Sequence, residues 1–379
     1  MEKNLINFAQ DYYKTNKFIS LHEPRFIGNE KKYLIDTVDS TFVSSIGEYV
    51  EKFEKDISSF TNANSALSVV NGTAAIQLSF HLSGVKNNDL VISPALTFVA
   101  ACNVLIHMGA EPIFIDVDKD TLGLCPKALE LYLEENAVQE GNNCIHKFSK
   151  KKIKAIIPMH TFGHPVQMDE IKKISDKWKL SLIEDAAEAF GSKYKGKYCG
   201  TLSEMGCFSF NGNKIITTGG GGMILFSDSE KANRARHLST TAKIPHAYEF
   251  FHDEAGFNLR MPNINAALGV AQLESINFYI NQKRDLASKY KDLFSDTNYI
   301  FVDEPKYSES NFWLNSIICE DKESRDNFLK ITNSADVMTR PVWELMSNLP
   351  TFVNCYKGDL SNSEWLRDRL VNIPSSVKI

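Results

Sequence analysis

Short apolar runs alternate with helical segments along roughly the first 60% of the chain. Seven runs are expected to be strands, at residues 66–70, 90–93, 112–117, 153–159, 181–184, 207–210 and 223–226. Helical spacing of apolar residues predicts helices at residues 47–63, 73–82 and 168–179. Because the runs are continuous rather than alternating, they predict a mostly parallel sheet covered by helices on both faces, an α/β fold. A hairpin-like, antiparallel pairing of the last two runs is an open alternative.

The pattern changes after the seventh run. Residues 263–290 predict one long helix, and residues 310–319 and 339–343 predict short strands. A chain of 379 residues is too long for one small core. We therefore predict two closely packed domains: a large domain at residues 1–255, N-terminal segment included, and a smaller C-terminal α+β domain at residues 256–379.

Composition narrows the class of protein. A net charge of -5 gives no basic surface for nucleic acid or an anionic membrane. Seven cysteines, an odd number without a CxxC pair, argue against a disulfide framework or a zinc site, so no metal is expected. The N-terminus lacks an apolar signal-peptide core, and no apolar stretch approaches the length that crosses a bilayer. A reducing cytoplasm fits these features best.

A turn of small residues follows the first predicted strand. Asn71-Gly72-Thr73-Ala74-Ala75 stands between that strand and a predicted helix. The backbone N–H groups and the dipole of a helix N-terminus attract anions, and the Thr73 hydroxyl can add a hydrogen bond to a phosphate. The alternative is an ordinary helix cap, because Asn and Thr are common at that position.

A carboxylate and a lysine follow two later strands. Asp185 stands at the end of the run at residues 181–184, at the sheet edge where α/β proteins bind ligands. Lys214 follows the run at residues 207–210 and precedes a run of four glycines, which lets the backbone approach a ligand closely. Taken singly, a helix-capping Asp and a solvated surface Lys are the alternatives.

The three features together match the needs of one cofactor. Pyridoxal phosphate requires a phosphate cradle, a carboxylate that keeps its pyridine nitrogen protonated, and a lysine amine that binds it covalently. The order cradle, Asp185 and Lys214, each at a predicted strand end, satisfies all three. The sequence therefore predicts a pyridoxal phosphate enzyme that carries its cofactor on Lys214.

Ten ordered motifs then connect the chain to a family. They are Gly28–Glu30, Ser44–Gly47, Asn71–Ala75, Pro94–Phe98, His160–Pro165, Glu184–Glu188, Gly212–Lys214, Asn258–Met261, Asn263–Glu274 and Thr339–Pro341. With these motifs, nearly the whole chain resembles the DegT/DnrJ/EryC1/StrS family of fold-type I aminotransferases, which act on nucleotide-linked keto sugars. The resemblance implies a large domain with a mostly parallel seven-stranded sheet and a smaller C-terminal domain.

The resemblance also implies roles for residues. Lys214 and Asp185 would be catalytic. Cofactor binding would fall to Gly72, Thr73, Ala74, Phe98, Asp185, Glu188, Ser209, Asn213, Lys214 and Asn258. Phe98 would stack on the ring, Glu188 would lie near the 3-hydroxyl, and Asn258 would reach the cofactor of a neighbouring subunit, which implies a homodimer with shared active sites. A core aromatic and a turn residue are the alternatives for Phe98 and Asn258.

Four further residues are candidates for substrate contact. His160 and His164 match a family motif after a strand and would line the active site; a metal pair is the alternative, but no third ligand is evident nearby. Arg260 belongs to another family motif. Arg340 would meet anionic groups of the substrate or the amino donor, unless it forms a structural ion pair.

The resemblance implies amino transfer from L-glutamate to C4 of a nucleotide-linked 4-keto-6-deoxy sugar. Asn211 and Gly220 resemble the branch that aminates UDP-2-acetamido-2,6-dideoxy-4-keto-glucose for bacillosamine or legionaminic acid glycans. A GDP-linked 4-keto sugar, by a perosamine-like or GDP-legionaminic route, is the alternative. Other rivals are a sugar dehydratase, which would carry His in place of Lys214, an amino-acid enzyme of this fold, and a non-catalytic binding or regulatory protein. Relatives usually continue beyond the position of Ile379 into a closing helix. Two explanations stay open: the sequence is truncated, or the protein is naturally short.

Overall fold

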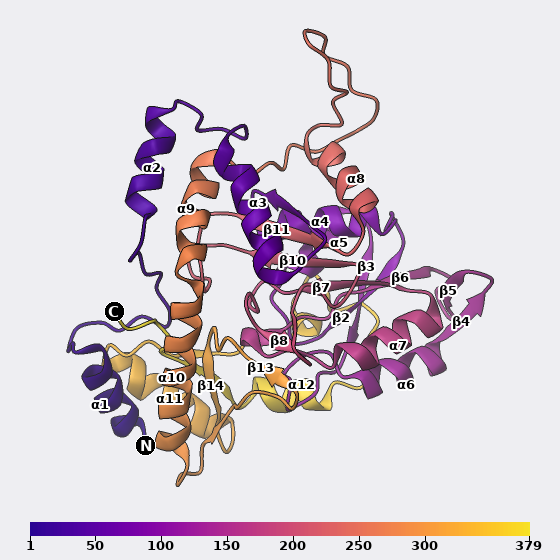
Figure 1. Ribbon diagram of the computed structural model, residues 1–379. Coiled ribbons are helices and arrows are strands. Elements are labelled where there is room, and N and C mark those ends of the chain that lie inside the picture. Colours follow the sequence, from indigo (N-terminus) through magenta and orange to yellow (C-terminus); the bar gives the residue numbers. More distant parts are fainter.

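The computed structural model describes residues 1–379 and contains a large sheet with helices packed on it and a smaller C-terminal layer (Figure 1). The large sheet has nine strands, and its main path runs β1-β11-β10-β7-β6-β2-β3. These strands are β1 (Ser65–Val69), β2 (Leu90–Pro94), β3 (Glu111–Ile115), β6 (Lys152–Ile156), β7 (Ser181–Asp185), β10 (Met205–Ser209) and β11 (Gly222–Phe226). All seven predicted strands are therefore present in one sheet.

Strand directions confirm the mostly parallel sheet. Strands β10, β7, β6, β2 and β3 are parallel, whereas β11 is antiparallel to both of its neighbours, β1 and β10. The predicted count of seven strands is too low, because β4 (Ala137–Glu140) and β5 (Asn143–His146) extend the sheet as a hairpin beside β6. Each strand has only two adjacent apolar residues, Ala137-Val138 and Cys144-Ile145, so neither carries an apolar run long enough for a sequence pattern to detect.

Helices cover both faces of the large sheet, as predicted. One face packs on α4 (Gly72–Leu82), α5 (Ala100–His107) and α8 (Ser229–Ser239). The other face packs on α6 (Pro126–Asn136) and α7 (Met168–Trp178) at one end, and on α3 (Glu48–Thr61) and α9 (Asn263–Glu274) at the other. The helix α2 (Glu30–Asp39) lies beside α9.

The predicted long helix at residues 263–290 is two helices. Helix α9 ends at Glu274, and α10 (Ile276–Phe294) begins after Ser275, whose φ of -103° and ψ of 4° are not helical. Serine is a favoured residue at a helix start, and the backbone carbonyl of Ser275 accepts the N–H of Tyr279 in the first turn of α10. Apolar periodicity continues through this junction, which is why the sequence pattern reads as one helix.

The C-terminal layer is built on an antiparallel sheet with the order β12-β14-β16-β15. Its elements are β12 (Ile300–Phe301), β14 (Asn315–Ile318), β15 (Arg340–Pro341), β16 (Leu370–Ile373), α11 (Lys322–Ser334) and α12 (Ser361–Arg367). The two strands expected here, at residues 310–319 and 339–343, are present but shorter than predicted. The first helix, α1 (Glu2–Tyr13), packs on α10 and α11 rather than on the large sheet.

Three short strands and two short helices complete the fold. The strands β8 (Lys193–Tyr194), β9 (Lys197–Tyr198) and β13 (Ser308–Glu309) form a small third sheet, and the 3-10 helices are η1 (Thr161–Gly163) and η2 (Met346–Asn348). Strand β13 precedes β14, so this sheet joins the two layers. None of the helices combines the length and the apolar character that a bilayer-spanning helix needs.

Candidate active site

A cavity of about 540 Å³ lies where the large sheet meets the C-terminal layer. The carboxyl ends of β1, β7 and β10 face it, as expected for ligand sites in α/β sheets. Nine of the residues predicted from the sequence line it: Gly72, Thr73, Phe98, Asp185, Glu188, Ser209, Asn213, Lys214 and Arg340. The fold thus brings together residues that are up to 268 positions apart, from Gly72 to Arg340.

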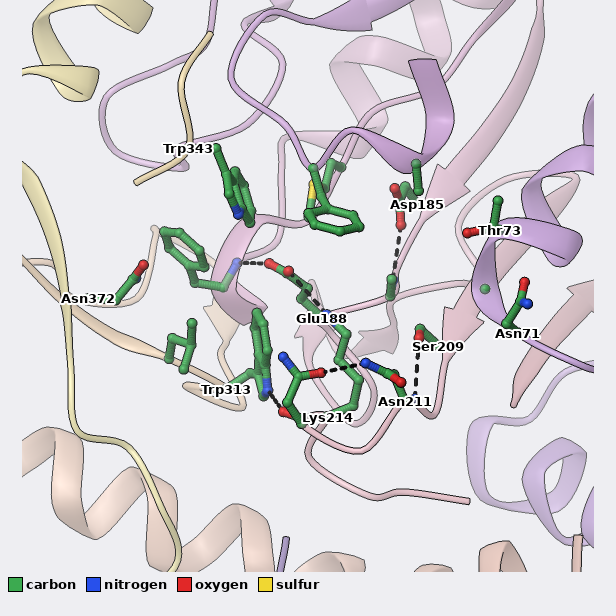
Figure 2. A pocket seen from close by; sticks show the side chains of 18 of the residues that line it. Asn71, Thr73, Asp185, Glu188, Ser209, Asn211, Lys214, Trp313, Trp343 and Asn372 are labelled. Carbon is green, nitrogen blue, oxygen red and sulfur yellow. Dashed lines mark hydrogen bonds and ion pairs between the residues drawn. The ribbon is translucent and has the colours of Figure 1, made fainter. Parts of the chain in front are cut away.

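Lys214 lies at the centre of these residues (Figure 2). Its Nζ is 3.2 Å from the Oε1 of Glu188 and 3.8 Å from the centroid of the Trp313 ring. The other carboxylate oxygen of Glu188 accepts the N–H of Phe162 at 2.9 Å. A lysine held on a buried carboxylate and an aromatic face is not the freely solvated surface charge that was its alternative.

Asp185 is the last residue of β7, and its carboxylate is buried at the cavity wall. Its Oδ1 accepts the N–H of Ala187 at 3.2 Å. Burial raises the pKa of Asp185, and the Ala187 N–H and the nearby charge of Lys214 offset part of this effect. A cationic partner within the cavity would offset the unfavourable free energy of burying this charge.

The predicted anion cradle is the N-terminus of α4 together with the end of β10. The side chain of Asn71 caps the helix by accepting the N–H of Ala74 at 2.8 Å. The N–H groups of Gly72 and Thr73 belong to the first turn, where no helical carbonyl is available. A Cβ on Gly72 would lie 2.9 Å from the Cβ of Ser209, so glycine lets the turn approach β10 and puts Thr73 and Ser209 at one end of the cavity (Figure 2).

These residues fit pyridoxal phosphate. The helix N-terminus with Thr73 and Ser209 suits the phosphate, Asp185 suits a protonated pyridine nitrogen, and Lys214 supplies the amine. The buried carboxylate of Asp185 tests whether the site fits this cofactor. It faces the cavity without a cationic hydrogen-bond partner of its own, and a protonated pyridine nitrogen would be that partner.

The two histidines expected to contact substrate are fully buried and do not line the cavity. His160 Nε2 lies 3.0 Å from Glu184 Oε2, and its Nδ1 accepts the N–H of Val166. The Nδ1 that accepts this bond carries no proton, so His160 is a neutral imidazole whose Nε2–H donates to Glu184. The structure therefore gives His160 a structural hydrogen bond behind Asp185 instead of substrate contact.

His164 packs edge-on against Phe312, at 5.4 Å between ring centroids. Neither ring nitrogen has a hydrogen-bond partner, and burial lowers its pKa to about 4. His164 therefore does not line the active site as expected, because the turn of η1 directs its ring away from the cavity wall.

Three other predicted residues lie outside the cavity wall. The N–H of Ala74 is taken by the Asn71 cap, so it is not free for a phosphate. Asn258 is exposed, and its Oδ1 lies 3.5 Å from Arg260 Nη2. The backbone of Arg260 pairs with Val69 beside the cradle, but its side chain does not reach the cavity of its own chain.

The sequence prediction missed several aromatic and amide residues that line the cavity. Trp313, Trp343 and Asn372 come from the C-terminal layer, and Phe162 comes from η1. Trp343 contacts both Phe98 and Phe162, with ring centroids 6.1 and 5.0 Å apart. No local sequence signal distinguishes these aromatic residues from core residues, since only the packing of the two layers brings them to Lys214.

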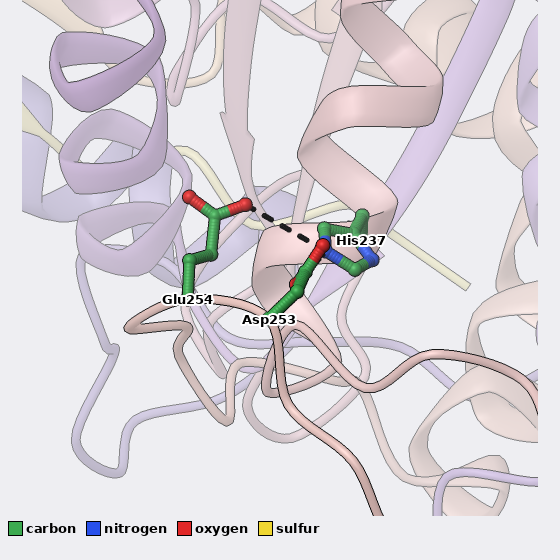
Figure 3. Close-up of side chains that lie close together, drawn as sticks. All are labelled: His237, Asp253 and Glu254. Carbon is green, nitrogen blue, oxygen red and sulfur yellow. Dashed lines mark hydrogen bonds and ion pairs between the residues drawn. The ribbon is translucent and has the colours of Figure 1, made fainter.

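A separate cluster lies at the base of the hairpin that joins α8 and α9 (Figure 3). His237 Nε2 is 2.8 Å from Asp253 Oδ1 and 3.6 Å from Glu254 Oε1. Arg234 pairs with both oxygens of Glu254. These contacts hold the end of the hairpin, at Asp253 and Glu254, against α8. None of the four residues lines the cavity.

The lysine, the buried carboxylate and the anion cradle define the site of a pyridoxal phosphate-dependent aminotransferase of fold-type I. The chain belongs to the DegT/DnrJ/EryC1/StrS aminotransferase family, whose model matches residues 25–379.

Relatives and solved structures agree with this family. The chain is 36% identical to GDP-perosamine synthase of Escherichia coli O157:H7, over 95% of this chain and 93% of that protein. It is 32% identical to GDP-perosamine synthase of Vibrio cholerae, over 94% of each chain. The crystal structure of the aminotransferase TlmJ from Streptoalloteichus hindustanus is similar with a TM-score of 0.85 and 25% identity, over 94% of this chain and 93% of that one.

These relatives correct the narrower sequence prediction. The family is confirmed, and three of the similar proteins, at 32–36% identity, are GDP-perosamine synthases, which favours the GDP-linked alternative over the UDP-bacillosamine branch. The glycine at position 220, which suggested that branch, has no packing reason to be glycine: a Cβ there would meet only the Val70 carbonyl at 4.0 Å. Gly220 therefore gives no steric information about the sugar.

Proposed function

We propose that this enzyme transfers the amino group of L-glutamate to C4 of a GDP-linked 4-keto-6-deoxy sugar and forms a perosamine-like 4-amino-4,6-dideoxy product. The observation that carries the proposal is the 36% identity to a GDP-perosamine synthase across nearly the full length of both chains. A cavity centred on Lys214 and Asp185 supports the same chemistry.

The cofactor, when bound, withdraws electrons from the carbon that bears the amino group, which makes the proton on that carbon acidic. Lys214 Nζ would remove that proton and return it. General acid–base catalysis of this kind typically raises the rate roughly a hundred- to ten-thousand-fold. Glu188 Oε1, at 3.2 Å, would hold the free amine in place while it transfers the proton. Asp185 would hold the ring nitrogen in its protonated form.

The C-terminal layer would bind the anionic groups of the substrate. Arg340 lies at the cavity with its Nη1 bonded to Asn333 Oδ1 and the Thr339 carbonyl, each at 3.2 Å. Those two contacts fix the guanidinium while its remaining N–H groups stay available for a phosphate or carboxylate. Phe98 would stack on the cofactor ring, and Trp343 beside it would flank the sugar and keep water from the reacting carbon.

We also expect a homodimer with shared sites. The hairpin at residues 240–258 projects beyond α8 (Figure 1) and exposes Tyr248 and Phe250, each at 80%. A second apolar surface lies on α2 and the loop after it, where Val38 and Phe42 are each 57% exposed. Exposed aromatic side chains of this kind mark contact surfaces, and Asn258 at the root of the hairpin could then reach a partner's cradle.

The substrate is tested with a panel of GDP- and UDP-linked 4-keto-6-deoxy sugars, L-glutamate and the cofactor-loaded enzyme, with products identified by mass spectrometry. Amination of the GDP sugar with the higher kcat/KM supports the proposal. A preference for the N-acetylated UDP sugar would overturn it. The matched control is Lys214→Arg, which keeps the charge and should give no product.

Shared sites are tested by mixing two impaired variants, Lys214→Ala and Asn258→Ala, under conditions that allow subunit exchange. If Asn258 acts across the interface, one site of each mixed dimer has both native residues, so activity returns. Continued inactivity of the mixture, with exchange shown by mass spectrometry, would place Asn258 in its own subunit's site or outside any site.

A further inference from the structure

Asn311 is a fully buried residue in the turn that precedes β14, and it does not line the cavity. Its side-chain NH2 donates to the backbone carbonyls of Glu188 and Phe190, both at 3.0 Å. Its side-chain oxygen accepts the N–H of Trp313 at 2.8 Å. The amide orientation is fixed by these partners, since only an NH2 group can satisfy two carbonyls.

The residues that Asn311 holds are the two that contact Lys214 Nζ. Glu188 belongs to the loop after β7 of the large sheet, and Trp313 belongs to the C-terminal layer. Their contacts to Nζ, at 3.2 Å and 3.8 Å, come from opposite layers of the molecule. A single side chain therefore fixes the distance between the two walls that enclose the amine.

The surrounding structure is shaped to this amide. Gly163 has a φ of +99°, and a Cβ there would lie 1.9 Å from the Asn311 side-chain oxygen. The backbone N–H of Asn311 donates to Ser192 Oγ at 2.9 Å, and Ser192 Oγ itself donates to the Gly163 carbonyl at 2.8 Å. The loop of Glu188 and the turn of η1 are thus both tied to the same residue.

Trp313 is held at its other polar groups as well. Its indole N–H donates to the Asn213 carbonyl at 2.7 Å, directly before Lys214 in the chain. Its own carbonyl accepts from the buried amine of Lys283 at 2.9 Å. With the Asn311 bond, every hydrogen-bonding group of Trp313 has a partner, so the ring is a rigid support for the amine.

We propose that Asn311 is a positioning residue for Lys214: it sets Glu188 and Trp313 at the separation that holds Nζ where proton transfer requires it. The inference rests on the function proposed for Lys214. It predicts that loss of the amide lowers the rate of proton transfer and leaves substrate affinity nearly unchanged, because Asn311 does not itself line the cavity. A misplacement of about 1 Å can cost roughly a hundredfold in rate.

The experiment compares Asn311→Ala and Asn311→Asp with the control Asn315→Ala. Asn315 is equally buried in the same layer, four residues on, and its amide bonds only Ser375 Oγ. In the half-reaction with L-glutamate, Asn311→Ala should lower kcat about a hundredfold with KM nearly unchanged, whereas Asn315→Ala should keep kcat near the native value. Equal losses in both variants, or a raised KM at native kcat, would overturn the proposal.

A second readout needs neither cofactor nor substrate. The chain has four tryptophans, so 5-fluorotryptophan gives four 19F signals, and Trp313→Phe identifies the one from Trp313. Asn311→Ala should shift that signal. Asn311→Asp keeps the acceptor for the Trp313 N–H but loses both donors to the Glu188 loop, so it should shift the signal less and still lower kcat.

A Trp313 signal that is unmoved in Asn311→Ala would overturn the proposal. If Asn311→Ala does not fold, Asn311→Ser carries the same prediction. Because the 19F signals are independent of turnover, a wild-type enzyme that did not react with glutamate would refute the proposed function while leaving this test intact.

Discussion

Replacement of Asp185 by Asn should have opposite effects on stability and on catalysis. Asp185 is 3% exposed and its carboxylate has one hydrogen bond, from the Ala187 N–H. Asn has nearly the same shape and keeps the oxygen that accepts this bond. The substitution therefore removes the buried charge without creating a cavity.

The stability effect follows from the direction of the pKa shift. Burial raises the pKa of Asp185 in the folded protein. A raised carboxyl pKa means that the charged form costs stability at pH values above it, and that this cost disappears as the pH falls through it. In the cofactor-free protein, Asp185→Asn should have a higher Tm than the native chain at pH 8, and the difference should shrink on acidification.

The catalytic effect has the opposite sign. A hydrogen bond to a charged group is worth about 1.5–3 kcal/mol, which corresponds to roughly a ten- to 150-fold change in rate or affinity. Steady-state kinetics with glutamate and the keto sugar should show a loss of kcat of at least this size. A variant that kept native kcat, or that melted lower than the native chain without cofactor, would refute the role assigned to Asp185.

Three further changes test other parts of the account. His160→Leu should destabilise the fold by about 1–3 kcal/mol in denaturant titrations at pH 7, because it removes one of the donors that satisfy the buried Glu184 and leaves Gly200, Leu202 and Ser203 as the others; no loss would contradict this contact. Thr73→Val should weaken cofactor binding about tenfold, measured by fluorescence titration, because its hydroxyl would bind a charged phosphate; unchanged affinity would remove Thr73 from the cradle. Gly163→Ala should lower Tm, because the position has a φ of +99° and its Cβ would overlap the Asn311 side chain; a native Tm would contradict that packing.

The parts of the site that sequence could predict share one property. Thr73, Asp185 and Lys214 each follow an apolar run, so the strand ends themselves place them at one edge of the sheet. The fold class was predictable for the same reason. The β4–β5 hairpin was not, because each of its strands has only two adjacent apolar residues, too few for a periodic signal.

The rest of the site depends on tertiary packing. Trp313 contacts Lys214 although the two are 99 positions apart, and Asn311 acts through backbone groups that no motif records. His160 follows a strand just as Asp185 does, but its side chain turns toward Glu184 behind the cavity. The direction of a side chain after a strand depends on the local turn, which the apolar pattern does not specify.

The most direct test of the central claim is the location of the cofactor. The enzyme is loaded with pyridoxal phosphate, the covalent link is reduced with borohydride, and the digested protein is examined by mass spectrometry. We expect the added mass on the peptide that contains Lys214 and none on a Lys214→Ala protein treated in the same way. A modification that lies on another lysine, or that survives in Lys214→Ala, would contradict it.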